Sequence, residues 1–367
     1  MKRLLCILGL LAATASGFDM ARPGYEYEFP RDHFSHPAFE TEWWYYTGNV
    51  KTPQGRRFGF ELTFFRYAIR EQPAADSPWS IRDLYLAHFT LSDVEGQRFY
   101  KTDRLNRAGP GLAGAAADKA RIWNGNWKVE WLEPTAPLGP QRLKAHAQEF
   151  SVELILTPGK APVIQGINGV SRKAAGEGKA SHYVSFTRLA TAGSLTVDNE
   201  TFEVEGLTWM DHEFSSDSLG EGQVGWDWMS IQLDDGTEFM LYRMRRSDGT
   251  ADPYSSGTYI DVEGRAEHLA WSQIQMKPIA GSEWTSSTTG GAYPLKWEVE
   301  VPHLGLRLTC TTDLDDQEVV SKRRVGPSYW EGAMDFAGDR AGKPVSGVGY
   351  LEMTGYDKPL QIGPQER

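Results

Sequence analysis

The stretch RFGFELTFF, residues 57–65, carries an aromatic or aliphatic side chain at every second position from Phe58 to Phe64. Smaller or polar residues occupy the positions between them: Gly59, Glu61 and Thr63. Side chains of a β-strand point alternately to its two faces, so this pattern predicts a half-buried strand.

The same alternation returns in other parts of the chain. It recurs at residues 85–91, 127–131, 150–156 and 295–301. Turn residues fall between such runs, with Asp235-Gly236 placed as a hairpin and Gln54-Gly55 and Asp198-Asn199 in similar positions. Helical periodicity is rare, and residues 115–122 form the best short candidate. We therefore expect an all-β protein of antiparallel sheets closed into barrels, because closure removes exposed edges.

Length and composition limit the classes of function. The 367 residues suggest two domains, and 12% of them are aromatic, which suits a β core or an apolar pocket. The formal net charge of −11 argues against nucleic acid or an anionic membrane surface as a partner. We expect residues 25–214 and 220–362 to form the two domains, because the pattern breaks near residues 215–223. The order of Trp44, Gly55 and Phe58 is repeated, at nearly the same spacing, by Trp226, Gly236 and Phe239. This weak internal repeat suggests two related halves.

The first 17 residues have the pattern of a targeting signal. Lys2 and Arg3 precede an apolar run and then small residues, the order of a cleaved secretory signal peptide. The expected location is the periplasm or the exterior. No later stretch is apolar for long enough to predict stable membrane insertion. Cys310 would remain the lone cysteine after cleavage, and its alternating neighbours predict a buried thiol.

The segment FETEWWYYTGNV, residues 39–50, has four consecutive aromatics. On a strand, Trp43 and Tyr45 oppose Trp44 and Tyr46, so one pair must face something other than the core. That can be a ligand pocket, or simply a second layer of protein covering the strand.

The segment LTWMDHEF, residues 207–214, combines aromatic and titratable side chains. Trp209 and Asp211 share one face of a strand, and His212 lies on the other. His212 could act as an acid or base oriented by a carboxylate. No metal site is predicted, because adjacent residues of a strand cannot converge on one ion.

Two further clusters complete the candidates. In GWDWMSIQL, Trp226 and Trp228 flank Asp227, which is either a proton donor or a structural acid at a domain junction. In YWEGAMDF, Tyr329, Trp330 and Glu331 open a strand that is either a polar ladder or a grip for the polar end of a ligand.

Taken in order, HPAFETEWWYYTGNV, LTWMDHEF and YWEG with GYLEMTGY resemble the AttH/carotenoid 1,2-hydratase family, over residues 25–359. The resemblance implies two tandem lipocalin-like β-barrels with an apolar substrate held between them by aromatics and a few acids. It points to Trp209, Asp211, His212 and Tyr242. It also implies a proton-donating aspartate two residues after such a tyrosine, where this sequence has Met244.

Two functions remain open at this point. One is an exported hydrolase or hydratase that uses an Asp211–His212 pair, with Asp227 or Glu331 as further acids. The other is a periplasmic carrier of a small hydrophobic molecule. The expected ligand-binding residues are the following aromatics: Trp43, Trp44, Tyr46, Trp209, Trp226, Trp228, Tyr242, Tyr329 and Trp330. No cofactor is predicted, and the sequence leaves the oligomeric state open.

Overall fold

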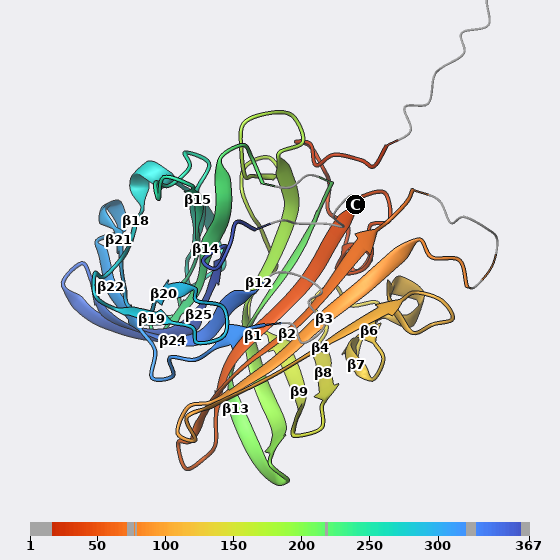
Figure 1. The fold of residues 1–367 in the computed structure, drawn as a ribbon, viewed down its shortest axis with the longest axis horizontal. Helices are drawn as coiled ribbons and strands as arrows, with labels where there is room; N and C mark the ends of the chain where they lie inside the picture. The colour runs from red at the N-terminus through yellow and green to blue at the C-terminus, as the bar shows by residue number, and fades with distance from the viewer. Residues whose placement is uncertain (1–16, 72–76, 78, 217–218, 321–327, 361–367) are drawn as a thin grey trace, which may run out of the picture.

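The computed structural model describes residues 17–71, 77, 79–216, 219–320 and 328–360. Nearly all of the expected signal segment, residues 1–16, lies outside this part of the chain. Within the described residues, no helix is both long and apolar enough to cross a membrane. The regular structure is almost entirely β (Figure 1).

The first sheet has 13 strands and winds into a nearly closed barrel. In spatial order its main path is β4 (Arg98–Arg107), β3 (Asp83–Asp93), β2 (Arg57–Ala68), β1 (Thr41–Lys51), β13 (Glu200–Ser215), β12 (Ala180–Val197), β9 (Phe150–Pro158), β8 (Gln141–His146), β7 (Trp127–Trp131), β6 (Arg121–Asn124) and β5 (Ala113–Ala116). Two short strands, β10 (Val163–Ile164) and β11 (Ser171–Arg172), pair with β12.

The second sheet has 10 strands and forms a half-barrel. Its main path is β17 (Ala266–Ala270), β16 (Ser256–Ile260), β15 (Glu238–Arg246), β14 (Gln223–Leu233), β25 (Lys343–Thr354), β24 (Tyr329–Arg340), β22 (Leu306–Thr311), β21 (Trp297–Val301) and β18 (Gln275–Pro278). The strand β23 (Glu318–Val319) pairs with β24, and β19 (Glu283–Thr285) with β20 (Ala292–Pro294) forms a separate hairpin. The described 3-10 helices are η1 (Arg31–His33), η2 (Ala117–Lys119), η3 (Trp271–Gln273) and η4 (Pro302–Leu304).

The two sheets share one winding scheme. Their opening hairpins, β1–β2 and β14–β15, each lie beside the final strand of their own sheet, β13 and β25 respectively. The turns expected in these hairpins are present, since Gly55 and Gly236 both adopt positive φ angles. The all-β expectation of two tandem barrel-type units is confirmed. The helix expected at residues 115–122 is wrong, because β5, η2 and β6 occupy that segment.

Each barrel has its own apolar core, and a third apolar cluster lies between them. The strands β1, β2, β12, β13 of the first sheet and β14, β15, β24, β25 of the second supply this junction. Residues 58–64 form a strand, β2, as predicted, but the expectation that this strand is half-buried is wrong. Both faces of β2 are buried here, one in the barrel and one against the second sheet.

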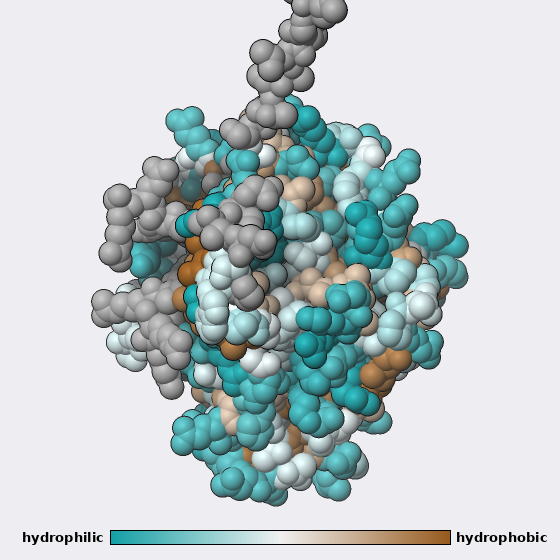
Figure 2. Space-filling model, turned by 90° about the vertical axis from the view of Figure 1, so that its right-hand side faces the viewer, coloured by the Kyte–Doolittle hydropathy of each residue, from teal (hydrophilic) through white to brown (hydrophobic). Residues whose placement is uncertain are grey.

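The face shown in Figure 2 is mostly hydrophilic, with apolar residues in scattered patches. Large exposed apolar residues such as Trp79, Ile167 and Val262 are far apart in the sequence. Cys310 is fully buried in the core of the second barrel, as expected.

Candidate functional site between the two barrels

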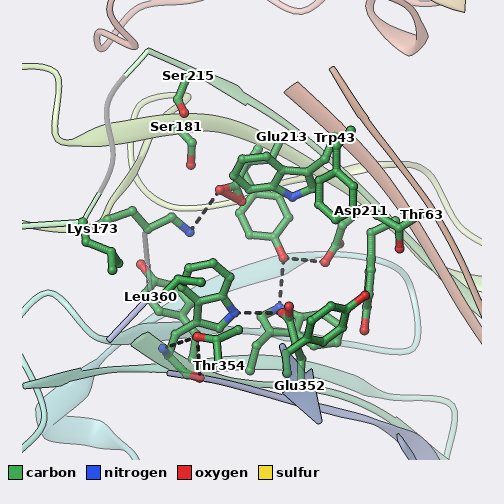
Figure 3. A pocket seen from close by; sticks show the side chains of 18 of the residues that line it. Trp43, Thr63, Lys173, Ser181, Asp211, Glu213, Ser215, Glu352, Thr354 and Leu360 are labelled. Carbon is green, nitrogen blue, oxygen red and sulfur yellow. Dashed lines mark hydrogen bonds and ion pairs between the residues drawn. The ribbon is translucent and has the colours of Figure 1, made fainter. Parts of the chain in front are cut away.

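A cavity of about 160 Å³ lies between the outer faces of the two sheets (Figure 3). Strands β1, β2, β3 and β13 line it from one side, and β14, β15, β24 and β25 from the other. An engineered apolar cavity of roughly 150 Å³ is large enough to bind benzene. The space is therefore sufficient for one ring or an equivalent length of aliphatic chain.

Strand alternation decides which predicted aromatics reach the cavity. Trp43 and Tyr45 line it, whereas Trp44 and Tyr46 point into the core of the first barrel. Trp44 donates its indole N–H to the carbonyl oxygen of His33 at 2.9 Å, which ties it to the barrel interior. One face of the aromatic run thus meets the cavity and the other builds the core.

The remaining predicted aromatics divide in the same way. The cavity lining includes Trp226, Trp228, Tyr242 and Tyr329. Trp330 is fully buried in the core of the second barrel and does not reach the cavity. Trp209 lies beside the lining residues and donates its indole N–H to Asp211 Oδ1 at 2.7 Å.

Asp211 and His212 do not form the predicted pair. Asp211 lines the cavity, and His212 points into the first barrel on the opposite face of β13. Three donors hold Asp211: Tyr183 at 2.6 Å, Ser185 at 2.5 Å and Trp209 at 2.7 Å. Burial raises the pKa of Asp211 to about 7, although these hydrogen bonds oppose the shift.

Asp227 also lies away from the cavity. Arg243 donates to its Oδ2 at 2.7 Å and Arg245 to its Oδ1 at 2.8 Å, and Tyr356 donates to Oδ1 at 2.8 Å. A carboxylate with two cations and a phenol is a structural ion pair rather than a proton donor. Asp227 is thus a structural acid, but its partners on β15 and Tyr356 all belong to the second barrel, so its expected place at a domain junction is not confirmed.

Glu331 stands next to the cavity and belongs to a group of buried glutamates. Its Oε1 accepts a hydrogen bond from Tyr45 at 2.5 Å, and its Oε2 has no partner among the described residues. Glu352 lies directly opposite on β25, with Oε2 accepting from Trp226 at 2.8 Å. Burial, together with Glu61 and Glu352, raises the pKa of Glu331 well above its ordinary value. Burial raises the pKa of Glu352 to about 8.

Glu61 lies on the face of β2 opposite the one that carries Phe60 and Leu62. It lines the cavity from β2 and is fully buried. Its Oε1 accepts from Thr63 at 2.7 Å and from Tyr329 at 3.0 Å, and its Oε2 has no partner among the described residues. Burial raises the pKa of Glu61 to about 7.

His88 contacts Tyr329 and so extends the hydrogen bond between Tyr329 and Glu61. Its Nδ1 lies 2.6 Å from the hydroxyl of Tyr329, which itself donates to Glu61. The ring therefore donates through Nδ1–H and leaves Nε2 as an acceptor, and Nε2 has no partner among the described residues. Burial lowers the pKa of His88 to about 4, so the ring is neutral near pH 7. A hydrogen-bonded chain from β3 through β24 to β2 thus ends on a cavity acid.

The cavity contains much more acid than base. Asp211, Glu213 and Glu352 line it with Glu61, while Lys173 is the one lysine or arginine among its described lining residues. Lys173 lies 3.5 Å from Glu213 Oε1 (Figure 3). Burial raises the pKa of Glu213 even beside this cation. Several carboxyls here can therefore carry a proton near neutral pH.

The sequence offered one signal that would have located Glu61. Its face of β2 continues through Phe65 and Tyr67, which are too apolar for a solvent-facing surface. The strand therefore has two apolar faces, and Glu61 lies among aromatics rather than in water. His88 carried no such signal, because its contact with Tyr329 spans 241 positions of sequence.

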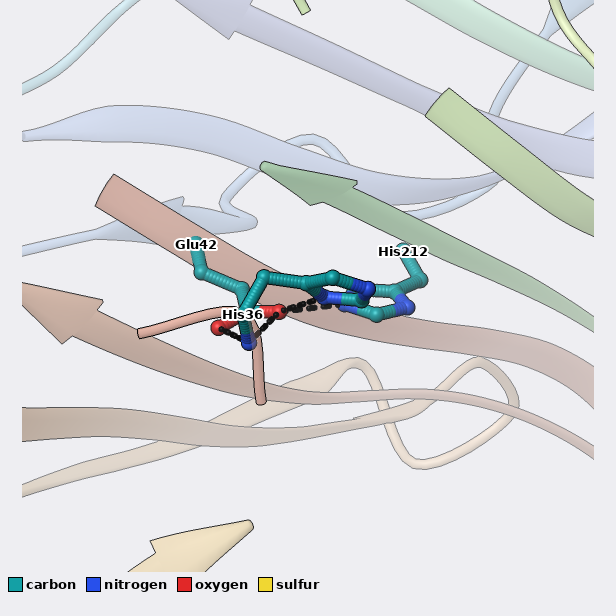
Figure 4. A group of neighbouring side chains, drawn as sticks. All are labelled: His36, Glu42 and His212. Atoms are coloured by element: carbon teal, nitrogen blue, oxygen red, sulfur yellow. Dashed lines mark hydrogen bonds and ion pairs between the residues drawn. The ribbon is translucent and has the colours of Figure 1, made fainter. Parts of the chain in front are cut away.

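A second group of titratable side chains lies on the other side of β1 and β13, inside the first barrel (Figure 4). It consists of His36, Glu42 and His212, with one donor or ligand atom of each within 4.8 Å of the others. Glu42 also accepts from Arg66 Nε at 2.9 Å. Burial opposes the charge on Glu42, yet His36 and Arg66 hold its pKa well below the usual value. Among the described residues, this is the group that could hold a metal ion.

The comparisons with known proteins address the fold and the family together. The model of the AttH-like family matches residues 20–356. The chain belongs to the AttH-like family.

Two solved structures share the fold of this AttH-like protein. A crystal structure assigned to AttH, from Nitrosomonas europaea, is 33% identical with a TM-score of 0.80, covering 92% of this chain and all of that one. Kievitone hydratase from Nectria haematococca has a TM-score of 0.69 at 16% identity, covering 94% and 97% of the two chains. At that identity the second likeness shows the fold alone.

The curated relatives add two names. Kievitone hydratase of Fusarium solani subsp. phaseoli is 24% identical over 161 residues, covering 44% of this chain and 43% of its own. The dehydratase asqC of Emericella nidulans is 24% identical over 197 residues, covering 53% and 55%. The AttH-like chain thus matches about half the length of these relatives. The family resemblance stated from the sequence is confirmed.

Proposed function

We propose that this AttH-like protein is exported and binds an apolar molecule between its barrels, where it adds water across a carbon–carbon double bond or forms such a bond by removing water from an alcohol. The buried carboxyl of Glu61, with a pKa near 7 and one oxygen directed at no partner among the described residues, is the observation that carries the proposal. The names of its hydratase and dehydratase relatives support the reaction class. The N-terminal pattern supports export.

Aromatic walls and buried acids suit this chemistry. In hydration, the Glu61 O–H bond breaks as a new C–H bond forms, and the resulting cation takes the oxygen of water. The proton lost from that water returns to the Glu61 carboxylate, so atoms and charge balance. Dehydration is the reverse, with the same carboxyl protonating the leaving hydroxyl. Trp228 and Tyr45 meet edge to face with ring centres 5.2 Å apart, and such aromatic faces stabilise a passing cation.

Met244 does not prevent this reaction. The resemblance expects a proton donor at that position, and methionine has no acidic proton. Met244 lines the same cavity as Glu61, which comes from the opposite sheet. We propose that the acid role is taken by Glu61, held by Tyr329 and supported by the neighbouring Glu331.

The test begins with the bound molecule. Small molecules extracted from protein purified from its native host are identified by mass spectrometry and incubated with fresh protein in water enriched in heavy oxygen. The proposal expects products that differ by one water and carry the heavy label after hydration. Glu61→Gln should reduce turnover by about 10²–10⁴-fold, the usual contribution of one positioned acid.

A carrier would give a different outcome. The molecule would return unchanged after long incubation, and Glu61→Gln would retain its affinity. Trp228→Ala would weaken binding for a carrier and an enzyme alike, so it serves as a control for occupancy of the cavity.

A further inference from the structure

The cluster inside the first barrel has an unusual arrangement of acceptors. His36 Nδ1 lies 2.7 Å from Glu42 Oε1, and its Nε2 lies 3.0 Å from Asp32 Oδ1. His212 Nε2 lies 2.8 Å from the same Glu42 oxygen, and its Nδ1 lies 3.1 Å from the carbonyl oxygen of Asp32. All four ring nitrogens therefore face oxygen atoms of Asp32 or Glu42.

A neutral imidazole cannot satisfy two such acceptors. It has one N–H, so its other nitrogen presents a lone pair to an oxygen that also offers lone pairs. Two imidazolium ions would solve the problem, but the rings are fully enclosed, with centres 5.4 Å apart. Both rings would also share Glu42 with the buried guanidinium of Arg66, so three cations would lie around this carboxylate, with Asp32 and Asp83 as the other acids nearby.

We propose that His36 Nδ1, His212 Nε2 and a carboxylate oxygen of Glu42 bind one divalent ion of the zinc type. Each histidine then keeps a single N–H, which donates to Asp32, to its carboxylate from His36 and to its carbonyl from His212. Metal-binding histidines ordinarily donate their second N–H to a carboxylate or a backbone carbonyl in this way. Two imidazoles and one carboxylate are a ligand set that zinc accepts.

Charge and packing agree with this assignment. Arg66 holds Glu42 Oε2 at 2.9 Å and Asp83 at 3.0 Å, while Glu42 Oε1 faces both rings and also accepts from the backbone N–H of His36 at 3.1 Å. The carboxylates of Asp32, Glu42 and Asp83 surround the ion and Arg66, and Arg31 and Arg82 also contact Asp32 and Asp83. Ligand atoms of a tetrahedral zinc site lie about 3.3 Å apart, given bond lengths of about 2.0 Å. The side chains need to open by about half an ångström to admit the ion.

The ion would connect two distant parts of the chain. His36 precedes β1, Glu42 lies on β1 and His212 lies near the end of β13. The site would fix the segment around η1 to the barrel. It lies on the opposite face of β13 from the cavity and does not depend on the proposed reaction.

The test measures metal directly in the full chain. Because the site is buried, untagged protein is unfolded with chelator and refolded with or without Zn²⁺ or Co²⁺. We expect one equivalent of metal per chain by elemental analysis, and visible absorption typical of low-coordinate Co²⁺. His36→Asn and His212→Asn should each abolish this uptake. Asp32→Asn should keep all three ligands and lower the affinity about 10–100-fold.

A matched control is His182→Asn. His182 is also buried near Phe214, but its Nδ1 faces only the carbonyl oxygen of Gly169. This variant should bind the full equivalent of metal. Nitrogen NMR of wild-type protein provides a reading without mutation. Non-protonated His36 Nδ1 and His212 Nε2 in the metal-loaded chain support the site. A folded chain that takes up no metal and shows both rings doubly protonated would overturn it.

Discussion

Gly59 shows how a single residue sets the distance between the barrels. A Cβ atom at this position would lie 2.7 Å from both the Cβ of Ala333 and the hydroxyl of Tyr350, on the opposing sheet. We expect Gly59→Ala to destabilise the protein by about 1–3 kcal/mol, the usual cost of overpacking. Chemical denaturation measures the loss. Adding Ala333→Gly should recover part of it, and an equal loss in the double variant would show that this contact does not limit the approach.

Tyr329 is a second single residue with a specific effect, because its hydroxyl lowers the pKa of Glu61. Its hydroxyl donates to Glu61 Oε1 and thereby favours the ionised carboxylate, against the effect of burial. Tyr329→Phe removes this donor, so we expect the pKa of Glu61 to rise above its value of about 7. Infrared difference spectra of the carboxyl band during a pH titration follow the change. Tyr67→Phe alters another lining phenol and should leave Glu61 unchanged. Equal titrations in both variants would contradict the tuning role.

At the scale of elements, Glu238 of β15 connects the two sheets. It is fully buried, and it accepts from Lys160 at 2.6 Å and from Arg188 of the bulged strand β12. Burial raises the pKa of Glu238 although Lys160 and Arg188 both lower it, so the cost of desolvating this carboxylate is the larger effect. We expect Glu238→Gln to cost about 3 kcal/mol, the lower end for breaking a buried pair.

The control for Glu238 is an exposed pair in the first barrel. Lys144 and Glu153 lie 2.7 Å apart with about half of each side chain exposed. Glu153→Gln should change the free energy of unfolding by less than about 1 kcal/mol. A similar small effect of Glu238→Gln in urea denaturation would show that the buried contact does not stabilise the junction.

The observed strands show what the alternation of the sequence could predict and what it could not. Alternation predicted several strands, among them β2, β3, β7 and β9, and the opposing faces of Trp43 and Trp44, because a strand allows only two directions. It could not say which face met the second barrel, since that depends on contacts hundreds of residues apart. The Asp211–His212 pair does not form for a local reason, because adjacent residues of a strand point to opposite faces. Glu42 meets His212 through the β1–β13 register, which no local pattern contains.

At the scale of the whole molecule, the cavity acids predict how stability depends on pH. The folded pKa values of Glu61 and Glu352 are about 7 and about 8, against an ordinary value of 4.5. Between these values the unfolded chain releases protons that the folded chain retains. The free energy of unfolding should therefore decrease as the pH rises from about 4.5 to about 8, and then level off with respect to these groups.

Urea denaturation at a series of pH values from about 5 to 8 measures this slope. The double variant Glu61→Gln, Glu352→Gln should make the slope less steep, because amides do not titrate, and Asp211, with its pKa of about 7, should keep part of it. Glu153→Gln, on the surface, should keep it. Identical slopes in the wild-type protein and the double variant would contradict protonated carboxyls in the cavity.

The cavity lies outside both barrels, and each barrel contributes one wall of it. For the ligand that we propose, selectivity can consequently diverge without disturbing either hydrophobic interior, since the residues that line the cavity are not those that fill the cores. Chimeras between family members that exchange residues 223–354 would recombine half-sites, giving each new pairing a different ligand spectrum on an unchanged scaffold.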